Sequence, residues 1–205
     1  MGKLIWLTIF FSVLIWSAIN PADRYTWWLE VAPALIALVI LAYTYRRFPL
    51  TPLIYQLILV HCIILMIGGH YTYAEVPLFN WMQEWFDWSR NHYDKVGHFV
   101  QGFVPAMVAR ELFIRLEIVD PLKNAWRNFL IVSVCLAISA FYELIEWWVA
   151  LLSEQAAESF LGTQGYVWDT QSDMFYALIG AIIALVLLGK PHDRQLQRLL
   201  KNDKE

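Results

Sequence analysis

Residues 129–152 read FLIVSVCLAISAFYELIEWWVALL, an apolar run whose only charged residues are Glu143 and Glu146. A helix of ~20 predominantly apolar residues spans the hydrocarbon core of a bilayer. The run therefore predicts a transmembrane helix. Because an ionisable side chain is costly inside hydrocarbon and normally faces a cavity or a partner, we expect both glutamates to face the interior of a bundle.

Five further apolar runs accompany this one. They lie at residues 4–19, 28–45, 53–69, 96–118 and 174–188. Of the 205 residues, 59% are hydrophobic and only 16% are charged, and one soluble core of this size cannot hide so much apolar surface. The sequence predicts an all-α fold: a polytopic membrane helix bundle of about six transmembrane helices, formed by residues 1–189.

The first apolar run has an alternative interpretation. It follows Lys3, and a charged start before a short apolar centre also fits a signal peptide. Residues 17–20 (SAIN) lack the small-x-small pattern of a cleavage site. We therefore favour a retained transmembrane helix.

The distribution of basic residues predicts the orientation, because cytoplasmic loops are enriched in Lys and Arg. With both termini on the cytoplasmic side, the outer loops carry only Arg24, Arg90 and Lys95. Residues 190–205 then form a basic cytoplasmic tail. The basic residues on the inner side are Lys3, Arg46, Arg47, Arg110, Arg115, Lys123, Arg127, Lys190, Arg194, Arg198, Lys201 and Lys204.

Two loops on the outer side are long. In the first, Trp81, Trp85 and Trp88 follow the i, i+4, i+7 spacing of one helix face. We expect residues 78–92 to form a short helix that lies flat in the membrane interface, where indole rings collect. The second long loop covers residues 153–168.

Three pairs of ionisable residues share helical spacing and one predicted depth. The fourth and sixth helices begin at the outer face and the fifth ends there, so the pairs should meet on the extracytoplasmic side. They are Asp94 and His98, Glu143 and Glu146, and Asp169 and Asp173.

Five carboxylates in a site of low dielectric need either protonation or a cation. Oxygen ligands with one imidazole suit Mg²⁺, Mn²⁺ or Zn²⁺, so all six residues are candidate metal ligands. His98, Glu143 and Asp173 are also candidate catalytic residues. The alternative is an interfacial network of helix caps, neutralised by Lys95 and by nearby basic residues, which are Arg90 and His92.

The segments that carry these residues resemble a known family. Residues 94–99 (DKVGHF), 143–147 (ELIEW), 168–173 (WDTQSD) and 177–181 (ALIGA) look like the YjdF-type bacterial inner-membrane proteins. They are more loosely similar to VanZ-like membrane proteins, which tend to pair Glu with Gln where this chain has two glutamates. The resemblance implies a bacterial inner (cytoplasmic) membrane location and supplies no established activity.

Three functions fit these observations. The first is an enzyme that acts on a lipid or envelope precursor, binding a lipid or polyprenyl head group through a metal. The second is a cation or proton transporter, and the third is a non-catalytic envelope or interaction protein. The bilayer is the expected partner, and a net charge of -3 without a broad basic face argues against nucleic acid.

Overall fold

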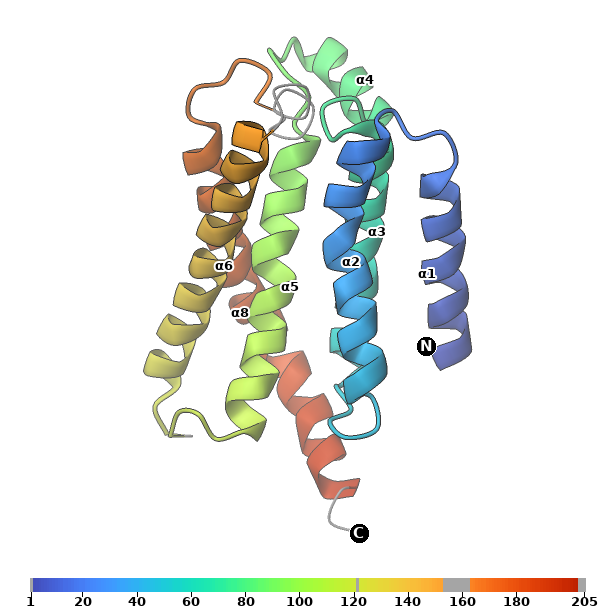
Figure 1. The fold of residues 1–205 in the computed structure, drawn as a ribbon. Helices are drawn as coiled ribbons and strands as arrows, with labels where there is room; N and C mark the ends of the chain where they lie inside the picture. Colours follow the sequence, from blue (N-terminus) through green and yellow to red (C-terminus); the bar gives the residue numbers. More distant parts are fainter. Residues whose placement is uncertain (1, 121, 153–162, 203–205) are drawn as a thin grey trace.

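The computed structural model describes residues 2–120, 122–152 and 163–202, and every regular element within them is a helix (Figure 1). This confirms the all-α prediction. The helices are α1 (Lys3–Ala18), α2 (Arg24–Thr44), α3 (Pro52–Tyr71), α4 (Pro77–Phe86), α5 (Tyr93–Arg115), α6 (Asn124–Leu152) and α8 (Asp169–Asn202).

Four helices, α2, α3, α6 and α8, are long and apolar enough to cross a membrane. At 16 residues, α1 is apolar but shorter. With 23 residues, α5 is long enough to span but carries several charged side chains. A multi-pass helical membrane protein is therefore confirmed, whereas the count of six crossings and the orientation stay predictions. The two termini lie toward the same end of the bundle (Figure 1).

The most polar long helix, α5, occupies the centre of the bundle. It packs against α3, α6 and most extensively α8. Its crossing with α8 is very close, because a Cβ at Gly102 would overlap the carbonyl oxygen of Ala177 and one at Gly180 would overlap that of Phe99. Small residues at both positions let the two backbones approach. The charged side chains of α5 are thereby screened from lipid by its neighbours.

A second packing unit joins α1, α2 and α3. Phe10 of α1, Val31 of α2 and Met66 of α3 are fully buried together in one apolar cluster. The indole of Trp6 also donates a hydrogen bond to the backbone oxygen of Tyr55, over 2.8 Å. This unit meets the α5–α6–α8 half of the molecule through contacts of α3 with α5.

The interfacial helix is shorter than predicted. In place of a helix over residues 78–92, α4 ends at Phe86, because Asp87 takes a left-handed conformation with φ 52°. The Trp88 amide donates back to the Gln83 carbonyl over 3.0 Å, as in a Schellman-type helix end. Trp81 and Trp85 remain exposed neighbours on α4, with ring centroids 4.9 Å apart, while Trp88 lies beyond it.

The structure tests the predictions for two segments only in part. Residues 190–202 continue α8 without a break, so no helix ends at residue 189. The division of the chain into a membrane domain and a tail at that residue stays a prediction. Of the second outer loop, residues 153–162 lie outside the described residues. In its described part, Gly165 has φ +81° and forms a turn.

Candidate functional site

The six ionisable residues singled out from the sequence lie together at one end of α5, α6 and α8. Each is at most 8% exposed, and the most buried is Asp173 at 2%. They occupy the start of α5, the later part of α6 and the start of α8, which share the end of the bundle where α4 lies (Figure 1). The structure thus brings together all three predicted pairs, while their chemical roles stay predictions.

His98 lies between the carboxylates of the other helices. Its Nε2 lies 3.3 Å from Oδ1 of Asp94 and 3.9 Å from Oδ2 of Asp173. Its Nδ1 lies 3.8 Å from Oε1 of Glu143 and 3.0 Å from Oε1 of Gln101. Each ring nitrogen therefore faces oxygen atoms. Nε2 lies on the side of α8, and Nδ1 lies on the side of α6.

Two permanent cations neutralise the α8 side of the cluster. The Lys95 ammonium contacts Oδ1 of Asp173 at 2.6 Å and Oδ1 of Asp169 at 3.0 Å. Arg90 also pairs with Asp169 at 2.5 Å and approaches Oδ2 of Asp94 at 3.6 Å. The sequence had left Lys95 and Arg90 as possible neutralisers, and the structure places both in that position.

Within the described part of the chain, no comparable cation pairs with the carboxylates on the α6 side. Glu143 and Glu146 are buried, and Oε1 of Glu143 has no hydrogen-bond partner among the described residues. Oδ2 of Asp94 also lacks a hydrogen bond there, but it lies within 3.8 Å of Lys95 and within 3.6 Å of Arg90. A buried carboxylate oxygen without a donor is costly, so Glu143 is the part of the cluster that needs either a proton or a further cation.

The loop before α5 closes the cluster from outside. Two hydrogen bonds join Asn91 and Gln164. The Asn91 backbone amide donates to Gln164 Oε1 over 2.9 Å, and Gln164 Nε2 donates to the Asn91 carbonyl over 3.0 Å.

His92, in the same loop, packs edge-on against Trp88. Partial burial, aided by the charges of Arg90 and Lys95, lowers the pKa of His92. His92 therefore adds no positive charge near neutral pH, unlike the two other basic residues.

One acidic residue of the cluster was missed by the sequence reasoning. Glu30 of α2 is 5% exposed and accepts a hydrogen bond of 3.3 Å from the Tyr142 hydroxyl of α6. The ring of Tyr142 lies edge-on to His98, with centroids 6.3 Å apart. The predicted topology also starts α2 at the outer face, so the depth argument applied to the other carboxylates could have included Glu30.

Two groups of three side chains have the spacing of metal ligands. One is Asp94, His98 and Asp173, and the other is His98, Glu143 and Glu146, with donor atoms within 4.8 Å of one another in each. Ligands of one Zn²⁺ lie ~2.0–2.2 Å from it, so each group must contract slightly to hold an ion. Because Lys95 already contacts Asp173, the group with Glu143 and Glu146 suits a metal better.

A second buried polar cluster lies at the other end of α5, around Arg110 and Glu111. Glu111 is fully buried and accepts from Thr51 and from Nε2 of His192, over 2.9 Å for the latter. Arg110, which can only donate, bonds Nδ1 of His192 at 2.8 Å. His192 is therefore held as the Nε2–H tautomer. This end of the bundle thus also contains buried charges, on Arg110 and Glu111.

Fold and site together define a multi-pass helical membrane protein with a buried acidic cluster near one membrane surface. The chain belongs to the predicted membrane protein family DUF2238, whose model matches residues 2–194. It is 55% identical over 186 residues to inner membrane protein YjdF of Escherichia coli (strain K12), which covers 91% of this chain and 88% of that protein. No solved structure matches the chain.

These matches confirm the resemblance to YjdF-type proteins and the location in the inner membrane. The looser similarity to VanZ-like proteins finds no support in them.

Proposed function

We propose that His98, Glu143 and Glu146 bind one divalent metal ion, and that this ion holds the phosphate of a lipid or envelope precursor for chemistry at the membrane surface. The single observation that carries the proposal is the buried Oε1 of Glu143, which has no hydrogen-bond donor among the described residues and faces Nδ1 of His98.

The charge balance supports a cation at this position. Six carboxyl groups converge here, whereas Lys95 and Arg90 are the permanent cations near them in the described part of the chain. Both cations lie on the side of Asp169 and Asp173. A divalent ion beside the two glutamates would offset their two negative charges without protonating either. The carboxyl groups are Glu30, Asp94, Glu143, Glu146, Asp169 and Asp173.

The surroundings of His98 also suit a metal ligand. A metal-bound histidine usually directs its other ring nitrogen to a carboxylate, which fixes the orientation of the ring. With Nδ1 toward the metal, in place of its contact of 3.0 Å with Gln101 Oε1, Nε2 would face Asp94 at 3.3 Å in this way. Asp173, on the same side of His98, would be available to accept a proton during catalysis. The metal would supply Lewis acidity toward a bound phosphate.

Metal analysis of the purified protein tests the proposal. We expect close to one equivalent of Mn²⁺ or Zn²⁺ in the wild type, and a large loss in Glu143→Gln and Glu146→Gln. Glu111→Gln is the matched control, because Glu111 is a buried carboxylate at the opposite end of α5. Negligible metal in the wild type after loading with each ion, or equal metal in all variants, would refute metal binding. Release of phosphate from lipid phosphates would then test catalysis.

A second candidate function is a non-catalytic envelope protein whose cluster is structural. The ion pairs of Lys95 with Asp169 and Asp173 favour it, because they stabilise the α5–α8 contact without any ligand. This alternative predicts that Glu143→Gln changes thermal stability and leaves every cellular phenotype intact. A phenotype lost at unchanged stability and abundance would contradict it.

Transport has weaker support. The two buried polar clusters are 13 positions apart along α5, from residue 98 to residue 111, which is about 20 Å of helix. Fully buried apolar residues, including Ala106, Met107 and Ala181, fill that interval. A proton or cation path would require polar groups or water there.

A further inference from the structure

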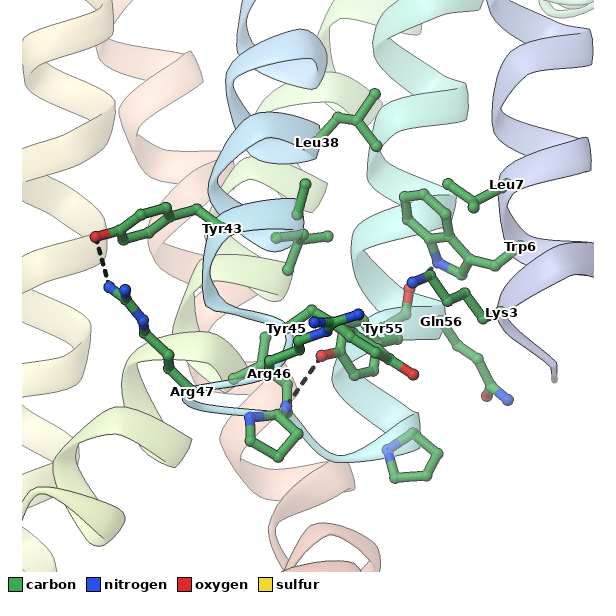
Figure 2. A pocket seen from close by; sticks show the side chains of 15 residues that line it. Lys3, Trp6, Leu7, Leu38, Tyr43, Tyr45, Arg46, Arg47, Tyr55 and Gln56 are labelled. Atoms are coloured by element: carbon green, nitrogen blue, oxygen red, sulfur yellow. Dashed lines mark hydrogen bonds between the residues drawn. The ribbon is translucent and has the colours of Figure 1, made fainter.

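A groove opens between α1, α2 and α3 at the end of the bundle opposite the acidic cluster (Figure 2). Its volume is about 840 Å³, within the range of ~300–1,000 Å³ typical of ligand sites. The groove arises because α1 packs on α3 while α2 packs on the other flank of α3. The hydrogen bond from Trp6 to the Tyr55 backbone fixes α1 at its floor.

The interior and the rim of the groove differ in chemistry. Trp6, Leu7, Leu38 and Leu41 supply apolar walls. The rim carries Lys3 from α1 and the basic pair that follows α2, while no Asp or Glu among the described residues lines the groove. An apolar slot with a purely basic mouth matches a molecule that has a hydrocarbon chain and an anionic head.

The basic side chains are held at the mouth by aromatic neighbours. Lys3 Nζ lies 4.4 Å from the centroid of the Tyr45 ring, a cation–π distance. Arg47 donates a hydrogen bond of 2.6 Å to the Tyr43 hydroxyl. Arg46 is exposed at the same rim, as Figure 2 shows. Figure 2 shows the Arg47 side chain turned toward Tyr43, away from Lys3. Lys3 and Arg46 are therefore the two cations available to one phosphate.

From this combination we infer that the groove is a binding site for an anionic phospholipid, with an acyl chain between α1 and α2 and the phosphate at Lys3 and Arg46. Basic residues near a membrane attract anionic lipid head groups individually, and two at one mouth make the attraction selective. The site is separate from the acidic cluster, so its occupation does not depend on the proposed metal.

Native mass spectrometry of the full-length protein in detergent tests the inference, with phosphatidylglycerol and phosphatidylcholine of identical acyl chains as probes. We expect the wild type to retain phosphatidylglycerol at least tenfold better. The double variant Lys3→Gln, Arg46→Gln should lose that preference. Ala42→Trp should reduce retention of both lipids, because Ala42 is exposed and lines the groove.

Two controls separate specific binding from general charge. Lys190→Gln, Arg194→Gln, Arg198→Gln removes three exposed cations from α8 at the same end of the bundle, outside the groove, and should keep the preference. Arg46→Gln alone should weaken it severalfold, so a folding defect of the double variant leaves the test intact. Equal retention of both lipids by the wild type, or the same loss in the α8 variant, would overturn the inference.

Discussion

The ammonium nitrogen of Lys95 lies 2.6 Å from Oδ1 of Asp173, joining the first turn of α5 to the start of α8. Asp173 is 2% exposed, so its carboxylate has little access to water. The same ammonium contacts Asp169 at 3.0 Å. Lys95 is therefore the internal counter-ion of the α8 carboxylates. It occupies the position that a metal ion would need in order to bind them.

Removal of this counter-ion should be costly. Lys95→Met leaves Asp173 buried without its ammonium, and breaking a buried pair typically costs ~3–5 kcal/mol. We expect a marked fall in the thermal unfolding temperature in detergent, largely recovered when Asp173→Asn is added. Lys123→Met, at an exposed lysine after α5, should change little. Unchanged stability of Lys95→Met would contradict the role of the pair.

The close crossing of α5 and α8 gives a second prediction. Gly102→Ala and Gly180→Ala each place a methyl group against the backbone of the other helix, so both should destabilise the bundle, by ~1–3 kcal/mol for overpacking. Gly189→Ala is the matched control on α8, because no heavy atom lies near its Cβ position. Helix propensity should make that variant neutral or slightly more stable. Unfolding in detergent distinguishes these outcomes, and equal behaviour of all three variants would disprove the close contact.

Hydrophobic runs and helical spacing were sufficient to predict the membrane class, the approximate helix positions and the meeting of Asp94, His98 and Glu143. These features depend on length, apolar character and direction of the chain, which a single sequence records. The end of α4 was not predicted, because it depends on the left-handed conformation of Asp87 rather than on the spacing of the tryptophans.

Which residues contact each other within the two clusters could also not be predicted from the sequence. Lys95 could be placed near Asp94 by helical spacing, but its contact with Asp173 depends on how closely α5 and α8 pack. His192 was assigned to a solvated tail, whereas it is fully buried against Glu111. A continuous α8 carries it back onto the bundle, and no local pattern signals that continuation through Pro191.

The inner cluster provides a third prediction, based on two neighbouring residues that both contact Arg110. His192→Ala removes the Nε2–H donor of a fully buried carboxylate, Glu111, and should cost ~1–3 kcal/mol. Asp193→Asn removes a pair with Arg110 whose Asp side chain is 49% exposed, and should cost less than ~1 kcal/mol. Thermal unfolding of the two variants compares the two losses of stability. A larger loss in Asp193→Asn than in His192→Ala would show that the exposed pair is the stronger one.

The start of α2 gives a prediction with a defined pH dependence. Oδ1 of Asp23 accepts a hydrogen bond of 2.6 Å from the Thr26 amide, as an N-cap. That bond lowers the pKa of Asp23 below its ordinary value of 3.8. A lowered folded-state pKa gives stability that is present above the unfolded pKa and is lost as the pH falls through the folded one.

Asp23→Ala should therefore destabilise the protein by ~1 kcal/mol at pH 7, with a smaller difference from the wild type near pH 3. Asp23→Asn keeps an N-cap acceptor without a titrating group. Its stability relative to the wild type should change only over the acid range in which Asp23 protonates. Unfolding temperatures of the three proteins, measured in one detergent at both pH values, isolate this residue from the other carboxylates, which all three share. A difference between Asp23→Ala and the wild type that is as large at pH 3 as at pH 7 would show that the ionised cap does not stabilise α2.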